Sequence, residues 1–143
     1  MFMGEYTHNI DRKGRLIMPA KFREELGERV YITRGMDGCL TVYPLQEWTN
    51  LYAKYSSLPS TNPDARMFMR FFMAKATEVE VDAQGRILIP ANLMKDAALE
   101  KECYIIGIAN RVGIWSKDRW LTLQEEMLPS YEKFAENLTP FLE

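Results

Sequence analysis

A ten-residue segment occurs twice in this chain of 143 residues, first as DRKGRLIMPA at residues 11–20 and then as DAQGRILIPA at residues 82–91. Five of the ten positions are identical, and three more exchange one aliphatic side chain for another. An internal repeat constrains the fold before any single residue is interpreted, because both copies must be able to adopt the same local structure. The sequence therefore predicts two equivalent structural units.

The similarity continues after each copy of the segment. Tyr31 corresponds to Tyr104 at a spacing of 73 residues, and Trp48 corresponds to Trp120 at a spacing of 72. Each unit then covers about 45 residues, close to the size below which one unit buries too little apolar surface to be stable alone. We therefore expect the two units to share one core.

The apolar pattern, the glycines and the prolines predict a mainly β fold with short helices, of the α+β class. A helix is expected at residues 20–26, with Pro19 at its first position and Gly27 at its end. The strands expected in the two units are residues 5–10, 15–18, 30–33 and 39–43, and residues 77–81, 86–89, 103–108 and 112–115.

Helices are expected outside the strand-rich parts as well. Trp48, Leu51, Tyr52 and Tyr55 have the spacing of one helix face, which we expect to be used for packing. Asp64 is expected to cap a second helix that runs to about Lys75. Ser116 is expected to cap a helix that leads into an acidic tail. The expected domains are a first repeat at 5–47, a helical connector at 48–75, a second repeat at 76–119 and a helical tail at 120–143.

The two halves of the chain differ in charge, although the net charge is only −2. Residues 1–75 contain 11 basic and 8 acidic residues, whereas residues 76–143 contain 7 basic and 12 acidic residues. Such asymmetry is a hint that the basic half meets a polyanion. Ordinary surface variation explains it equally well, so charge alone does not decide between these readings.

Several features favour a cytoplasmic protein. No apolar stretch approaches the ~18 residues of a membrane span, and the start MFMGEY lacks the basic leader of a signal peptide. Cys39 and Cys103 are not at equivalent repeat positions and have no partner at metal-binding spacing. We expect two buried or neutral thiols in a reducing compartment.

Nothing in the sequence indicates catalysis, a metal site or a cofactor. His8 is the single histidine, and no cysteine or carboxylate pattern surrounds it. The glycines are isolated and follow turns, unlike those of phosphate-binding loops. We therefore expect no catalytic residues, no metal and no cofactor.

The duplicated Asp-x-x-Gly-Arg segment is expected to form a tight turn. Asp11 and Gly14, like Asp82 and Gly85, have the side chains that such a turn requires, and we expect a structural role for all four. A rigid turn also presents neighbouring cations to phosphates or base edges. Only the first copy is strongly basic, with Arg12, Lys13 and Arg15, where the second has Ala83, Gln84 and Arg86. The alternative is an Asp–Arg surface pair of small energetic value.

The segments DRKGR and DAQGR, each followed by three aliphatic residues and Pro-Ala, together with YP-x-x-x-W after the first unit, resemble the MraZ family over nearly the whole chain. The resemblance implies that each half is similar to the SpoVT-AbrB DNA-binding domain and that the halves interlock as a swapped-hairpin β-barrel. It also implies a ring-shaped homo-oligomer that binds direct repeats in double-stranded promoter DNA. Such a protein regulates, usually as a repressor, its own operon in the division and cell-wall gene cluster.

The Asp-x-x-x-Arg pattern of the family falls here on Asp11 with Arg15 and on Asp82 with Arg86. A nucleoid-associated regulator is therefore expected. The residues expected to contact DNA are Arg12, Lys13, Arg15, Lys21, Arg23 and Arg86. For Lys21 and Arg23, on the helix after Pro19, simple solvation of an exposed helix face is an equal alternative.

Two other functions remain open from the residues. A self-assembling scaffold or partner-binding module without DNA binding would suit the acidic second half. An enzyme on a related β-barrel is the other, because a fold does not dictate chemistry. The lack of a catalytic constellation makes the enzyme the weaker of the two.

Overall fold

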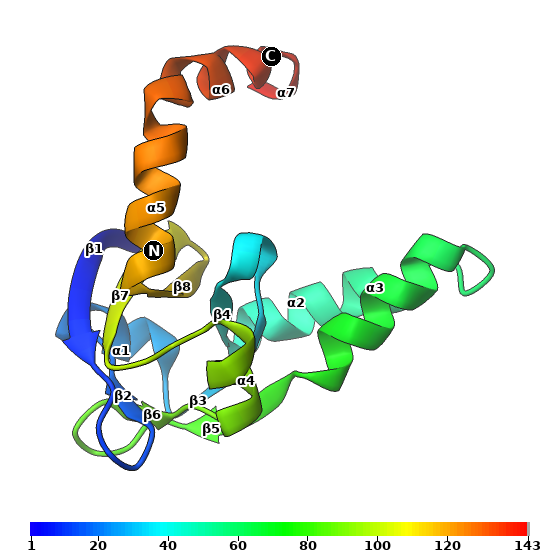
Figure 1. The fold of residues 1–143 in the computed structure, drawn as a ribbon. Coiled ribbons are helices and arrows are strands. Elements are labelled where there is room, and N and C mark those ends of the chain that lie inside the picture. The colour runs from blue at the N-terminus through cyan, green and yellow to red at the C-terminus, as the bar shows by residue number, and fades with distance from the viewer. Residues whose placement is uncertain (143) are drawn as a thin grey trace.

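The order strand, strand, helix, strand, strand, helix occurs twice along the chain, with helix α3 (Pro63–Ala74) between the two occurrences. The structure, a computed structural model, describes residues 1–142 (Figure 1). Its strands are β1 (Phe2–Asn9), β2 (Arg15–Ile17), β3 (Arg29–Arg34), β4 (Leu40–Pro44), β5 (Thr77–Glu80), β6 (Arg86–Leu88), β7 (Glu102–Ala109) and β8 (Arg111–Ser116). Its helices are α1 (Ala20–Leu26), α2 (Leu45–Ser56), α3 (Pro63–Ala74), α4 (Ala91–Asp96), α5 (Lys117–Met127), α6 (Tyr131–Asn137) and α7 (Thr139–Leu142). The predicted α+β class is confirmed.

The two repeats interlock in one antiparallel sheet of order β1-β7-β8-β4-β3-β5. Strand β1 of the first repeat pairs with β7 of the second, and β5 of the second repeat pairs with β3 of the first. Strands β4 and β8 pair at the centre. Each repeat therefore supplies an edge strand to the other, which explains why neither 45-residue unit needs a core of its own.

A two-stranded ribbon, β2 with β6, joins the repeats a second time. Backbone bonds extend this ribbon symmetrically: the N–H of Met18 donates to the carbonyl of Gly85 at 2.8 Å, and that of Ile89 donates to the carbonyl of Gly14 at 2.9 Å. Met18 and Ile89 occupy equivalent positions in the two repeats, as do Gly14 and Gly85. The repeats are thus related by an approximate two-fold arrangement.

The structure corrects the prediction of a β-barrel, because the sheet does not close. The six-stranded sheet is open, with β1 and β5 at its two edges. After each edge strand the chain turns at Asp11 or Asp82 and leaves the sheet, and β2 and β6 then pair with each other. Their backbone groups are used within the ribbon, so they do not bridge the two edges of the sheet.

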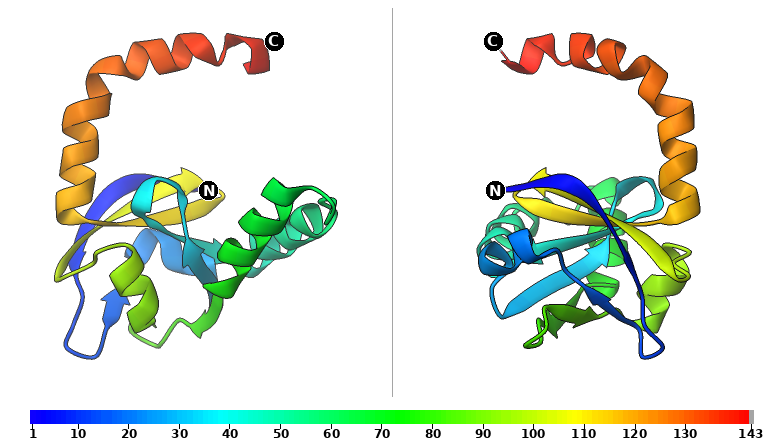
Figure 2. Two further views of the ribbon diagram at one scale, coloured as in Figure 1. Left: turned by 45° about the vertical axis from the view of Figure 1, so that its right-hand side comes forward. Right: turned by 90° about the vertical axis from the view of Figure 1, so that its left-hand side faces the viewer.

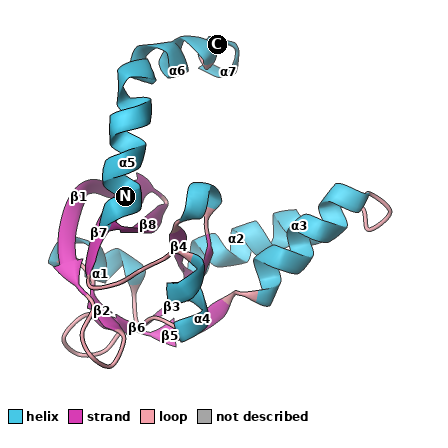
Figure 3. Cartoon of the chain, in the orientation of Figure 1, coloured by secondary structure: helices cyan, strands magenta, loops and turns pink. Residues whose placement is uncertain are grey.

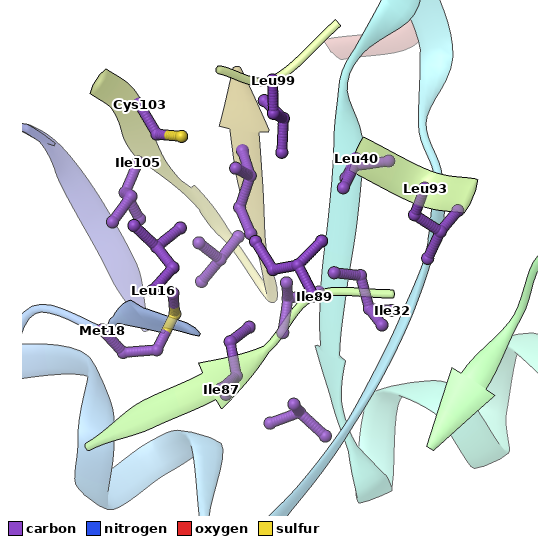
Figure 4. Close-up of a cluster of buried hydrophobic side chains, with 14 of the residues drawn as sticks. Leu16, Met18, Ile32, Leu40, Ile87, Ile89, Leu93, Leu99, Cys103 and Ile105 are labelled. Atoms are coloured by element: carbon purple, nitrogen blue, oxygen red, sulfur yellow. The ribbon is translucent and has the colours of Figure 1, made fainter. Parts of the chain in front are cut away.

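The core lies between the ribbon and the sheet (Figure 4). Leu16 of β2 and Ile87 of β6 are fully buried, and they meet Ile32 of β3 and Ile105 of β7 in one cluster. Helix α4 closes part of this cluster with Leu93. Both repeats therefore contribute to every layer of a single core, as the size of each unit predicts.

Most predicted elements are present, and specific contacts explain the differences at their ends. Strand β1 begins at Phe2, not at residue 5, because Phe2 pairs with Ala109 and is buried edge-to-face on Phe22. Helix α3 is capped by Asn62, whose side chain accepts hydrogen bonds from the N–H groups of Asp64 and Ala65. Asp64 is therefore not the cap. Helix α1 begins at Ala20, so Pro19 precedes its first residue.

Helices α2 and α3 form a helical hairpin, residues 45–74 (Figure 3). Stacked aromatic rings attach this hairpin to the sheet. Trp48 stacks on Tyr31 with centroids 5.3 Å apart, and Phe72 stacks on Trp48 at 5.8 Å. Such stacked pairs stabilise beyond their buried area. Trp48 therefore packs as predicted, whereas Tyr52 of the same predicted face is exposed.

The last helices form an arm, residues 117–142, that leads away from the sheet (Figure 2). Ser116 caps α5 as predicted, accepting a hydrogen bond from the N–H of Arg119. Large apolar side chains of the arm are exposed within residues 1–142, namely Leu128, Tyr131, Phe134, Leu138, Phe141 and Leu142. The arm thus presents apolar surface that the rest of the described chain does not cover.

The ribbon should be a main determinant of stability. We expect Ile87→Ala to lower the free energy of unfolding by about 3 kcal/mol, because it leaves a cavity in a core that both repeats build. Leu88→Ala, one residue along the same strand but 54% exposed, should cost less than about 1 kcal/mol. Urea unfolding of both variants measures the difference. Equal losses would show that the ribbon is not the buried layer described here.

Candidate nucleic-acid interface

The two Asp-x-x-Gly-Arg turns lie at the same end of the molecule. They connect β1 to β2 and β5 to β6, at the bottom of the views in Figures 1 and 2, opposite the arm. In the ribbon Arg15 pairs with Leu88 and Ile17 pairs with Arg86. Because these strands are antiparallel, the turns leave the ribbon at its opposite ends. A strand rises ~3.4 Å per residue and four residues separate Gly14 from Met18, which bonds to Gly85, so the two glycines lie roughly 14 Å apart along the ribbon.

The first turn is organised by the carboxylate of Asp11. One oxygen, Oδ1, accepts hydrogen bonds from the backbone N–H groups of Lys13 and Arg15, both at 2.9 Å. The other oxygen, Oδ2, accepts from Nε of Arg15 at 2.7 Å. Gly14 has a φ of 83°, a conformation that side-chain-bearing residues rarely adopt. One side chain therefore fixes both the backbone and the first part of the Arg15 side chain.

The second turn repeats this geometry. Asp82 accepts from the N–H groups of Gln84 at 3.0 Å and Arg86 at 2.8 Å, and from Nε of Arg86 at 2.7 Å. Gly85 has a φ of 81°. The equivalence inferred from the repeated segment thus extends to individual hydrogen bonds.

These hydrogen bonds lower the pKa of Asp11 and Asp82 below the ordinary value of 3.8. The largest cause is the backbone N–H of Arg15 or Arg86, and burial opposes it. The side-chain bond from the same arginine lowers the pKa further. Both carboxylates are therefore charged at neutral pH, so Arg15 and Arg86 are largely neutralised by their own turns.

The cations left over differ between the turns. Arg12 and Lys13 are exposed and form no ion pair within residues 1–142. Their counterparts, Ala83 and Gln84, are uncharged, and Oε1 of Gln84 accepts a hydrogen bond from Nη2 of Arg86 at 3.2 Å. The first turn therefore carries two exposed positive charges beyond its own Asp–Arg pair, and the corresponding positions of the second turn carry none.

Helix α1 contributes two further cations. Lys21 is exposed on the solvent side of α1. Arg23 instead lies against the second turn: its Nε donates to the carbonyl of Met18 at 3.1 Å, and its guanidinium occupies the space where a Cβ on Gly85 would lie. The structure thus brings Arg23 to the turn of the other repeat, which no local pattern in the sequence indicates.

Other chemistry is sparse in the part of the chain that the structure describes. Residues 1–142 contain no group of three or more His, Cys, Asp or Glu side chains able to hold a metal ion. None of their helices combines the length and the apolar character that crossing a membrane requires. Cys39 and Cys103 are buried, and burial raises the pKa of each thiol to about 11. Both thiols are therefore neutral at ordinary pH, as expected.

Comparison with known proteins agrees with this geometry. The family model described as "MraZ protein, putative antitoxin-like" matches residues 1–71 and again residues 72–140. The chain belongs to the MraZ family. Each matched segment of this MraZ chain contains one Asp-x-x-Gly-Arg turn, so the family model occurs twice, as the turn does.

Proteins named "Transcriptional regulator MraZ" are similar over their full lengths. That of Heliobacterium modesticaldum is 57% identical over 141 residues, which is 99% of each chain. That of Ligilactobacillus salivarius is 54% identical over 141 residues, again 99% of each. That of Desulforamulus reducens is 54% identical over 142 residues, covering 99% of this chain and all of the relative.

The two carboxylates should make stability depend on pH in acid. Their pKa is lower in the folded than in the unfolded chain, so their contribution is present above the ordinary pKa of 3.8 and is lost as the pH falls through the lowered value. We expect the melting temperature of Asp11→Asn/Asp82→Asn to lie below that of the wild type at neutral pH. The gap should close between about pH 5 and pH 2.

Thermal unfolding followed by circular dichroism across this pH range measures the gap. Glu125→Gln/Glu126→Gln is the matched control, because both residues are exposed on the arm and form no ion pair within residues 1–142. Its gap to the wild type should stay small at every pH. A gap for the Asp variant that widens in acid would contradict the assigned role of the turns.

Proposed function

We propose that this protein is a DNA-binding transcriptional regulator. The observation that carries the proposal is the pair of carboxylate-fixed turns, of which the first presents Arg12 and Lys13 without an ion-pair partner among residues 1–142. Proteins named as transcriptional regulators are more than half identical to the chain over nearly its full length, which supports the same function here. Rigid mounting reduces the entropy that is lost when cationic side chains contact DNA.

The basic residues of the turns make two kinds of contact with DNA, to base edges and to phosphates. We assign base-edge contacts in the major groove to Arg12 and Lys13, since these side chains are free to reach. Arg15 and Arg86 are tethered at Nε, and they contact phosphates with their remaining nitrogens. The full set of residues that we propose to contact double-stranded DNA is Arg12, Lys13, Arg15, Lys21, Arg23 and Arg86.

Assembly supplies the affinity that a single subunit lacks. One subunit can neutralise few phosphates, and such binding weakens steeply with salt. Several copies on repeated DNA sites convert later contacts into intramolecular events of high effective concentration. We therefore propose a ring-shaped homo-oligomer that binds direct repeats in the promoter of its own division and cell-wall operon, where it acts as a repressor.

The exposed apolar surfaces of the chain suit such an assembly. The arm exposes Tyr131, Phe134 and Phe141, and the helical hairpin exposes Tyr52 and Phe71. Residues 117–142 contain five acidic and three basic residues, whereas residues 45–75 contain four basic and two acidic residues. Contact between the arm of one copy and the hairpin of the next is heterologous, and such contacts form rings when the rotation closes.

Sequence preference should depend on Arg12 and Lys13. We expect Arg12→Ala/Lys13→Ala to reduce the preference for the DNA upstream of its own gene over a scrambled duplex by about tenfold to a hundredfold, because base-edge contacts are lost. Fluorescence anisotropy at fixed ionic strength measures both affinities. Lys117→Ala/Lys133→Ala removes the same charge from the arm and should keep the preference. An unchanged preference in the turn variant would refute the assignment, and a wild type without DNA binding would favour a scaffold.

Assembly should depend on the apolar face of the arm. We expect Phe134→Glu/Leu138→Glu to convert the oligomer to monomers and to weaken binding to the upstream DNA by about a hundredfold or more, because avidity is lost. Sedimentation and anisotropy measure the two effects. Lys133→Gln/Asn137→Glu changes the net charge equally on a neighbouring face and should remain assembled. Tight binding to the upstream DNA by a proven monomer would overturn the role of assembly.

A further inference from the structure

Arg23 is positioned by both repeats at once. Its helix, α1, belongs to the first repeat, and its Nε donates to the carbonyl of Met18 at the end of the ribbon. The carbonyl of Gly85 in the second repeat accepts the N–H of the same Met18. Met18 is thus bonded both to Arg23 of the first repeat and to Gly85 of the second. This places the Arg23 guanidinium on the second turn.

Gly85 is required for this contact for a reason beyond its backbone conformation. A Cβ at Gly85 would overlap Nε and Cζ of Arg23, both side-chain atoms of the other repeat. At Gly14 the same construction meets only ordinary van der Waals contacts, such as the methyl group of Met94 at 3.6 Å. The second turn thus has a close cationic neighbour that the first turn lacks.

Met94 is the equivalent of Arg23 in the second repeat, at the repeat spacing of 71 residues. It lies over Gly14 as Arg23 lies over Gly85, so the approximate two-fold arrangement includes these two side chains. Position 23 is charged and position 94 is apolar. The charge over a turn is therefore supplied by the partner repeat and not by the repeat to which the turn belongs.

Arg23 adds a net positive charge to the second turn. Without it, the only charged side chains of the second turn are the Asp82–Arg86 pair, whose charges cancel. Arg23 forms no ion pair within residues 1–142, and only its Nε is used in a hydrogen bond there. Its two Nη groups are thus left for an anion beside the Arg86 guanidinium.

We infer that Arg23, Gly85 and Arg86 form a composite phosphate-binding site that spans the two repeats. In this arrangement the first turn reads bases with Arg12 and Lys13, and the second turn clamps the sugar-phosphate backbone of the same duplex. The inference rests on the proposed DNA binding and adds an unequal division of labour between two turns of equal geometry. Phosphate contacts position a protein on DNA without reading sequence, whereas base contacts supply preference.

The test replaces Arg23 by methionine, the residue at the equivalent position 94 of the second repeat. We expect Arg23→Met to weaken binding to the upstream DNA and to a scrambled duplex by the same factor, about tenfold or more, because a charge-assisted contact is lost in every engaged subunit. The slope of log affinity against log salt should become shallower by about 0.9 per engaged subunit. Anisotropy titrations at several salt concentrations measure both quantities.

Three further variants complete the experiment. Arg23→Lys retains the charge and should retain most of the salt slope. Met94→Arg places a cation over the first turn and should steepen the slope for both duplexes. Lys133→Met removes one charge from the arm, at the opposite end of the molecule, and should leave the slope unchanged.

Each outcome decides the inference. Wild-type slope and affinity in Arg23→Met, with melting temperature and oligomer size unchanged, would refute the composite site. Loss of preference without uniform weakening would instead make Arg23 a base-reading residue and equally refute it. If Arg23→Met unfolds, Met94→Arg decides, because an unchanged slope would then count against the site. Absence of DNA binding by the wild type would reject the proposed function itself, a result distinct from all of these.

Discussion

The pairing of β2 with β6 is the contact on which the rest of the structure depends. These two strands come from different repeats, and each follows directly after a turn. Their pairing buries Leu16 and Ile87 beneath the sheet and also sets how far apart the turns lie. Because each repeat lends an edge strand to the other as well, the same strand pairings build the core and position the turns. Loss of this strand pairing would therefore remove the core layer of Leu16 and Ile87 and also the strands that hold the two turns in place.

The two aspartates fix the backbone of the short turns that precede β2 and β6. Each carboxylate accepts two backbone N–H groups and one arginine Nε, so the turn holds its shape without any partner from outside. Equal geometry does not produce equal chemistry, because the side chains between Asp and Gly differ in charge. The family relationship and the repeat explain the common shape, and the exposed cations explain why the first turn is the better candidate for reading DNA.

The helical hairpin and the arm begin with equivalent helices, α2 and α5, but continue in different ways. Helix α2 is followed by α3, which returns to stack Phe72 on Trp48, whereas the segment after α5 turns away and leaves its apolar residues exposed. The second repeat thus lacks the returning helix that covers the first. This difference breaks the approximate two-fold arrangement and gives the chain unlike surfaces at its two ends, as a head-to-tail assembly requires.

The sequence by itself determined the duplication, the α+β class, the turns and most helices and strands, because repeated segments, turn glycines and apolar spacing act through neighbours along the chain. Asp11 and Gly14 were recognisable as a turn for the same reason. Only the tertiary structure decided that the sheet stays open, since the pairing partner of β2 lies about 70 residues away in sequence and no local pattern specifies whether a strand bridges two sheet edges. Asn62 caps α3 through a contact that is local in the chain, so that difference from the predicted Asp64 cap does not come from the tertiary structure. The tertiary structure did decide that Arg23 belongs to the turn of the other repeat, because that contact joins residues far apart in the sequence.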